Sequence, residues 1–409
     1  MNAVMKKLLF LLSLGLLSAS CSRQETMEAL TERVFERAAG QFALLDANLD
    51  AAAEENAGQL CPRYADADGK LVTSSIWWWC SGFYPGSLWL VYEYTGDEAV
   101  KALAEKHTEV LDSIQFRTND HDVGFQLNCS YGNGFRLTGN PAYKEVLCNG
   151  ARSLATRFNP AVGCTRSWDP APDHIAAWKF PVIIDNMMNM ELLLNAAELS
   201  GEDSLRLVAE THAMTTMKNH YRPDGSSFHL VDYDPETGDV LVQQTVQGFA
   251  DGSAWARGQA WGLYGFTMMY QYTGGKQYLD HAVKIADYLL PRLPEDGVPY
   301  WDFDSDRIPD DLRDASAGAI MASALVQLSR YVPEGKSAEY LSVAERIIRT
   351  LASEKYLSAP GEESGFLLKH SVGNKPGGVE VDVPLTYSDY YFLEALLRYK
   401  ALSDKKAGF

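Results

Sequence analysis

Three short segments of the chain combine carboxylates with residues that can hold an anionic ligand or move a proton. The first segment, residues 118–125, carries Asp120, His121 and Asp122 in succession at the start of a predicted helix. A carboxylate at a helix start often only caps the free backbone N–H groups. Three consecutive ionisable residues exceed the needs of one cap, so this segment is a candidate for chemistry.

The second segment places Asp185 after an apolar run and before Asn186 and two methionines. Apolar surroundings disfavour the charged carboxylate and raise the pKa of the group, as a general acid near neutral pH requires. The alternative is that Asp185 only caps the helix that follows. Asn186 can take that cap instead, which would leave Asp185 free to face a pocket.

The third segment, residues 247–262, places Arg257 and Trp261 one turn apart, on the same face of a predicted helix. The planar guanidinium of Arg257 is suited to a carboxylate, and Trp261 offers a flat apolar wall. The glycines of the segment permit close helix packing or the close approach of a ligand. A buried, purely structural Arg257 is equally compatible with this pattern.

Composition and missing motifs exclude several other classes of function. The formal net charge of the 409 residues is −18, so the surface repels phosphate backbones and nucleic acid is not an expected partner. An anionic substrate would therefore need a local pocket rich in cations or donors. The chain has no G-x-S-x-G elbow, no H-E-x-x-H zinc motif, and neither a P-loop nor a dinucleotide-binding fingerprint.

A recurrent glycine turn organises the sequence into helix pairs. Gly96, Gly139, Gly201 and Gly274 each follow one helical apolar pattern and precede another, which predicts a left-handed cap and a tight α-hairpin turn. Residues 331–335 form a looser version. The helical patterns predict twelve helices, at residues 26–46, 86–94, 97–114, 124–137, 141–158, 185–199, 203–218, 253–272, 276–292, 315–331, 337–355 and 385–402.

Six antiparallel helix pairs that close on themselves would form an all-α (α/α)6 barrel, with an open α-solenoid as the alternative. Long inserts between the pairs would then gather at one end, and such loops are usually functional. Within one insert, residues 227–233 and 239–246 predict a β-hairpin. The inserts lie at residues 47–85, 159–184, 219–252, 293–314 and 356–384.

Residues 1–21 are typical of a targeting segment. A positive start and a short apolar run lead to small residues and Cys21, which resembles a bacterial lipobox with a lipidated cysteine. The alternative is an ordinary cleaved signal peptide. We expect a lipoprotein of the Gram-negative cell envelope, periplasmic or surface-exposed, whose only membrane contact is this anchor. Residues 22–409 are expected to form one domain, as a monomer or weak dimer. Of its five cysteines at least one must stay unpaired; buried structural thiols are the default, and disulfides remain possible.

The three segments, together with two others, resemble glycoside hydrolase family 88, the unsaturated glucuronyl hydrolases, which include unsaturated chondroitin disaccharide hydrolases. The five matching motifs occur in the family's order and span most of the chain. The resemblance implies an (α/α)6 barrel without metal or organic cofactor. It also implies an unsaturated uronate-containing oligosaccharide as substrate. The matching stretches are residues 79–86, 121–125, 184–189 and 247–261, and residues 381–384 followed by 389–392.

The resemblance implies a hydration reaction. Asp185 would protonate C4 of a C4=C5 double bond in the terminal uronate and help to add water at C5. Asp122 matches the second essential carboxylate, which would contact sugar hydroxyls and keep Asp185 protonated by like-charge repulsion. The substrate-binding residues implied are Trp79, Phe83, His121, Trp168, His229, Gln247, Arg257, Trp261 and, with a weaker match, Tyr387.

Two alternatives remain open from the sequence. An unsaturated rhamnogalacturonyl hydrolase would use the same barrel on pectin fragments, and a non-catalytic glycan-binding lipoprotein would use a helical solenoid. The loop at residues 370–380 lacks the Ser-x-x-Ser-x-Lys pattern that resembles sulfate recognition in some relatives. This departure argues against a preference for sulfated glycosaminoglycans.

Overall fold

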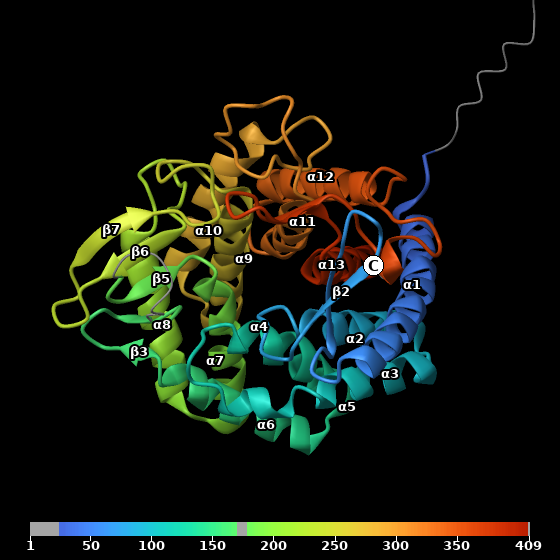
Figure 1. The fold of residues 1–409 in the computed structure, drawn as a ribbon. Helices are drawn as coiled ribbons and strands as arrows, with labels where there is room; N and C mark the ends of the chain where they lie inside the picture. Colours follow the sequence, from blue (N-terminus) through green and yellow to red (C-terminus); the bar gives the residue numbers. More distant parts are fainter. Residues whose placement is uncertain (1–23, 170–177, 408–409) are drawn as a thin grey trace, which may run out of the picture.

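The computed structural model describes residues 24–169 and 178–407, and within them the chain forms an (α/α)6 barrel (Figure 1). Cys21 lies outside the described residues. The inner ring consists of α2 (Phe83–Thr95), a rod made of α4 (Val123–Leu127), a π turn (Asn128–Gly132) and α5 (Asn133–Thr138), then α7 (Asn186–Ser200), α9 (Ala256–Thr273), α11 (Ala315–Leu328) and α13 (Thr386–Ala407).

The outer ring covers the inner one and confirms the predicted pairs. The last inner helix, α13, packs against both α11 and α2, so the ring closes and the open solenoid is wrong. Each of the twelve predicted helices is present, and α1 runs further than predicted. The outer helices are α1 (Met27–Glu55), α3 (Glu98–Glu109), α6 (Pro141–Ala155), α8 (Asp203–Asn219), α10 (Lys276–Leu289) and α12 (Glu334–Leu351).

The glycine turns lie at one end of the barrel, which we call the base. Gly96, Gly139, Gly201 and Gly274 follow α2, α5, α7 and α9 with φ between 67° and 78°, as predicted. A side chain at any of them would meet open space, so the left-handed backbone rather than crowding requires glycine. The core between the rings includes α11, whose small residues are all buried.

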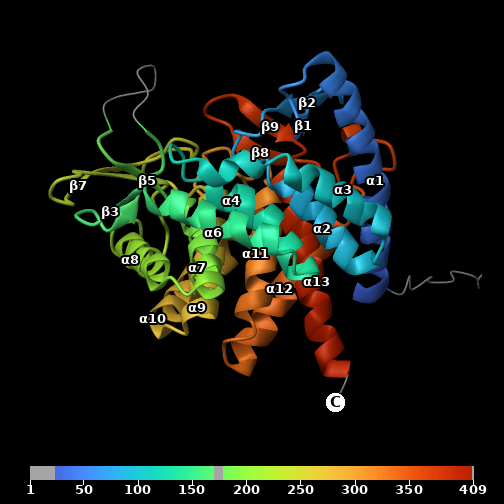
Figure 2. The ribbon, with the colours of Figure 1, turned by 90° about the horizontal axis from the view of Figure 1, so that it is seen from below.

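The inserts gather at the opposite end, which we call the mouth (Figure 2). The predicted hairpin is present as β6 and β7, and β5 pairs with β6, which the sequence did not predict. Because β5 leads into α7, this sheet fixes the position of Asp185. The strands are β1 (Cys61–Ala65), β2 (Leu71–Ser74), β3 (Phe158–Asn159), β4 (Cys164–Thr165), β5 (Pro181–Ile183), β6 (Leu230–Tyr233), β7 (Val240–Gln244), β8 (Ser371–Asn374) and β9 (Val379–Val383).

Two smaller expectations concern cysteines and membrane contact. Buried thiols, the default interpretation of the sequence, are confirmed, and the structure forms none of the disulfides that the sequence left possible: Cys61, Cys80, Cys129, Cys148 and Cys164 are all free and buried. No described helix combines the length and the apolar character needed to cross a bilayer.

Candidate active site

A cavity of about 480 Å³ opens at the mouth of the barrel, where the inner helices begin. Each inner helix follows an insert or loop in the sequence, so its N-terminus faces this end. Helix N-termini carry partial positive charge and free N–H groups, which favour an anionic ligand. The helix N-termini thus provide the donor-rich pocket that an anionic substrate needs in a chain whose net charge is −18.

Asp185 lies at the wall of this cavity, between β5 and α7. It precedes the first residue of α7, but its side chain does not cap the helix, so the capping alternative is wrong. Burial raises the pKa of Asp185 to about 6, against the opposing charge of Arg257. Asn186 does not cap either, because its amide donates to Thr165 O at 2.8 Å and accepts from Ser167 Oγ.

His229 is fixed beside Asp185 in one tautomer. Its Nδ1 accepts the backbone N–H groups of Val246 at 3.0 Å and Gln247 at 3.3 Å, so the proton of the neutral ring is on Nε2. That Nε2 lies 3.8 Å from Asp185 Oδ2, and neither atom has a protein hydrogen-bond partner. Burial lowers the pKa of His229 to about 3, so the ring is neutral and its N–H points toward the carboxyl.

Asp122 forms the second carboxyl of the cavity and also does not cap its helix. Burial raises its pKa well above the ordinary value, and the charges of Asp120 and Asp185 raise it further. His121 Nε2 lies 3.5 Å from Asp122 Oδ2, and burial lowers the pKa of that imidazole to about 4. It is therefore unfavourable for Asp122 and Asp185 to be ionised at the same time. Burial is the first cause of the raised pKa of Asp185, as its apolar neighbours in the sequence predicted, whereas the charge of Asp122 is not among the causes there.

Arg257 connects the first turn of α9 to the β8–β9 hairpin. Its Nη1 donates to Val372 O and its Nη2 donates to Gly373 O at 2.7 Å, while Gln247 Nε2 donates to the same Gly373 carbonyl. Asp314 Oδ2 lies 3.8 Å from Arg257 Nη1, and both side chains are buried. The guanidinium fork that the sequence assigned to a substrate carboxylate is therefore occupied by main-chain carbonyls, which hold the hairpin against the cavity.

The predicted binding residues fall into two layers. The first layer lines the cavity and the second lies behind it, packed against the core. Phe83, for example, packs behind Trp79 with its ring centroid 5.8 Å away, and Tyr387 does so at 4.9 Å. The lining set is Trp79, His121, Asp122, Trp168, Asp185, Gln247 and Arg257, and the set behind it is Phe83, His229, Trp261 and Tyr387.

Several buried polar atoms without a hydrogen-bond partner lie where the two layers meet. Asp185 Oδ2, His121 Nε2, Trp261 Nε1 and Tyr387 Oη are all buried without a protein hydrogen-bond partner. Such atoms are rare in folded proteins and are normally satisfied by a ligand or by water. The proximity of the Trp261 indole also lowers the pKa of Asp185, against the larger effect of burial.

The sequence did not identify the outer rim of the cavity. Arg63 pairs with Glu380 at 2.5 Å and its guanidinium lies 4.0 Å from the ring centroid of Trp78. Trp77 is 48% exposed, and Arg117 lies beside it while pairing with Asp120 at 2.6 Å. The three consecutive tryptophans Trp77, Trp78 and Trp79 were the sequence feature that could have indicated this rim. Glu380 has a left-handed φ of 55°, a strained conformation typical of functional segments.

Within the described residues, one group has metal-ligand geometry. Ligand atoms of Asp120, His121 and Asp122 lie within 4.8 Å of one another. Arg117 already pairs with Asp120 in this group. The expectation of a reaction without metal stays a prediction.

A closed helical barrel that holds two buried carboxyls in an aromatic cavity is the arrangement of a glycoside hydrolase. The model of glycosyl hydrolase family 88 matches residues 54–400, and the chain belongs to this family.

Relatives and solved structures agree with this assignment. The chain is 46% identical over 323 residues to an unsaturated glucuronyl hydrolase of Formosa agariphila, covering 78% of this chain and 79% of the relative. An unsaturated glucuronyl hydrolase of Bacillus sp. GL1 is 35% identical, with 83% and 91% covered. The structure of an unsaturated glucuronyl hydrolase specific for heparin superimposes with a TM-score of 0.86 at 44% identity, covering 92% and 98%.

Proposed function

We propose that this glycoside hydrolase releases a 4,5-unsaturated uronic acid from the non-reducing end of oligosaccharides produced by polysaccharide lyases. The observation that carries the proposal is Asp185, a buried carboxyl that caps no helix and whose pKa is raised to about 6. Such a group holds a proton near neutral pH and can give it to carbon. The two relatives named above, both unsaturated glucuronyl hydrolases, support the same substrate class.

The reaction adds water across the double bond. Asp185 donates its proton to C4, and a water oxygen bonds to C5 while its released proton returns to Asp185. The C5 hemiketal then opens: the bond from C5 to the ring oxygen breaks, and that oxygen takes the hydroxyl proton. The resulting C1 hemiacetal expels the remaining sugar as an alcohol. Because no displacement occurs at C1, the carboxylate separation does not predict anomeric stereochemistry.

The surrounding residues have complementary roles in this proposal. Neutral His229 directs its Nε2–H toward Asp185 and orients the carboxyl. Asp122 accepts sugar hydroxyls beside His121, and Trp79 and Trp168 provide apolar walls for the rings. Arg257 holds the β8–β9 hairpin in place and keeps positive charge near the uronate.

The charge pairing at the rim favours an aglycone without sulfate near Trp77 and Trp78. Arg63 and Arg117 line this part of the cavity, and each already has a carboxylate partner. A sulfate group would have to displace Glu380 or Asp120 from its arginine. The absence of the Ser-x-x-Ser-x-Lys pattern at residues 370–380 agrees with this preference.

A panel of lyase-derived disaccharides tests the function. We expect loss of the ultraviolet absorbance of the conjugated double bond, faster for unsulfated glycosaminoglycan disaccharides than for sulfated ones. Turnover of unsaturated rhamnogalacturonan fragments alone would favour the pectin alternative, and binding without turnover would favour a glycan-binding protein.

We also propose that Cys21 is lipidated and anchors the enzyme in the envelope of a Gram-negative bacterium. The support is the sequence of residues 1–21 alone. Metabolic labelling with a fatty-acid analogue and membrane fractionation test it: Cys21→Ala should lose both the label and the membrane association, and retention of both would contradict it.

A further inference from the structure

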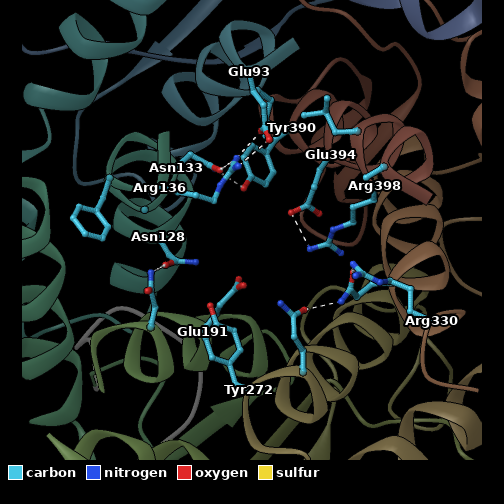
Figure 3. A pocket seen from close by; sticks show the side chains of 18 residues that line it. Glu93, Asn128, Asn133, Arg136, Glu191, Tyr272, Arg330, Tyr390, Glu394 and Arg398 are labelled. Carbon is cyan, nitrogen blue, oxygen red and sulfur yellow. Dashed lines mark hydrogen bonds and ion pairs between the residues drawn. The ribbon is translucent and has the colours of Figure 1, made fainter. Parts of the chain in front are cut away.

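A second cavity, of about 510 Å³, lies at the base of the barrel, among the C-terminal halves of inner helices (Figure 3). We call it the basal cavity. All six inner helices or their immediate ends contribute to it, and its lining is mostly amide, carboxylate, guanidinium and tyrosine side chains. Its volume lies in the range of small-molecule sites. No residue of the catalytic cavity takes part in it.

Two of the three carboxylates in the basal cavity form ion pairs with arginines. Glu93 forms a bidentate pair with Arg136, at 2.8 and 2.6 Å. Glu394 accepts hydrogen bonds from Arg398 at 3.1 Å and from the Tyr264 hydroxyl at 3.0 Å. These pairs account for the charge on two sides of the cavity.

Glu191, on α7, is the exception. Its carboxyl points into the basal cavity (Figure 3), and among the described residues no cation lies within ion-pair distance of it. Burial raises the pKa of Glu191 to about 7, and the charge of Glu394 adds to this effect against the charge of Arg398. Arg398 and a hydrogen bond with Asn128 act against this rise, but a positive group of a ligand would meet a carboxyl that has no ion-pair partner among the described residues.

The rest of the lining suits a hydroxyl-rich ligand. Asn195 donates to Asn128 at 3.0 Å and Gln327 donates to Gln271 at 2.9 Å, which leaves other amide donors and acceptors for hydroxyl groups. Tyr272 adds a ring to the same wall. Because inner helices end at the base, their C-terminal carbonyls favour a cation there.

We propose that the basal cavity binds a small polyhydroxylated molecule that carries an ammonium group, such as an amino sugar, with the ammonium group on Glu191. The ligand chemistry is the reverse of that at the mouth, where helix N-termini face an anionic uronate. The proposal stands independently of the reaction proposed above.

Titration calorimetry of the full-length enzyme with glucosamine, glucose and N-acetylglucosamine tests it. Glucosamine should bind most tightly, because only its amine can pair with Glu191. Glu191→Gln should weaken glucosamine binding by about tenfold or more, as expected for the loss of a charged hydrogen bond, and leave hydrolysis unchanged. Asp185→Asn should leave glucosamine binding intact, which separates this site from the catalytic one.

A second variant, which should raise the affinity for glucosamine, distinguishes a loss of binding from misfolding. Arg330 is exposed at the edge of the basal cavity, and among the described residues its side chain donates one hydrogen bond, to Gln327 Oε1 at 3.4 Å. Arg330→Gln removes a positive charge that repels the ammonium group of the ligand, so it should raise the affinity for glucosamine severalfold. Equal affinities for the three sugars, or glucosamine binding that is lost in Asp185→Asn but not in Glu191→Gln, would overturn the proposal.

Discussion

The two ends of the barrel are built from the same inner helices and yet differ in almost every property. At the mouth the helices begin, long inserts surround them, and the buried acid Asp185 shares a cavity with Asp122. At the base the inner helices end, four of them in tight glycine turns that lead to outer helices, and Glu191 has no ion-pair partner among the described residues. The difference teaches that burial is the largest cause of the raised pKa of both acids, whereas the surrounding groups decide what each can do.

The largest expected effect separates the two buried acids by activity. Asp185→Asn should lower kcat by about two to four decades, because it removes the proton donor, while Glu191→Gln should keep the wild-type rate. Steady-state rates of absorbance loss measure both, with circular dichroism as the control for folding. An active Asp185→Asn variant would refute the mechanism.

A second comparison uses two arginine–carboxylate pairs. Arg257→Ala should cost about 3–5 kcal/mol of unfolding free energy, because it leaves Asp314 buried and unpaired and frees the β8–β9 hairpin. Arg136→Ala breaks a more exposed pair at the base and should cost about 1 kcal/mol or less. Urea denaturation measures both, and equal losses would contradict the difference.

The pH dependence should follow Asp185. Since Asp185 must be protonated to act, kcat/KM should be constant at low pH and fall about tenfold per unit above pH 6. The folded state also keeps this proton where the unfolded chain releases it, from about pH 4 to 6, so stability should decrease as pH rises through that window. The decrease in stability over this pH window should be absent in Asp185→Asn. If the variant still shows it, groups other than Asp185 cause the decrease.

A smaller effect is expected at the rim of the mouth. Trp77 is largely exposed there, so Trp77→Ala should raise KM about threefold to tenfold by removing a stacking surface, with little change in kcat. Phe116 is even more exposed but does not line the cavity, so Phe116→Ala is the matched control. Equal KM changes in the two variants would remove Trp77 from the substrate site.

The smallest effect concerns the turns at the base. Gly139→Ala forces a side chain into the left-handed region and should cost about 1 kcal/mol, with unchanged activity. Gly40, inside α1 and with open space around it, is the control, and Gly40→Ala should stabilise the protein by about 0.5–1 kcal/mol. Thermal melting of both variants checks the opposite signs.

The sequence predicted the parts of the molecule that local rules determine. The twelve helices and their turns follow from apolar periodicity and from glycines such as Gly139, which act over a few residues. The burial of Phe83 and Trp261 behind the cavity wall depends on tertiary packing and was not predicted. Arg63 and Glu380 meet across 317 positions of the chain, without any periodic signal, and the basal cavity has no sequence signature at all.

The position of α1 has a consequence for how the enzyme would stand on a membrane. Its 29 residues span about 44 Å, and it begins away from β1 and β2 and runs toward them (Figure 2). Cys21 precedes Met27 by six positions, and a fully extended linker of this length spans about 20 Å. A lipid on Cys21 would hold the base near the bilayer and turn the mouth outward, so substrate would arrive from the aqueous compartment and not along the lipid surface.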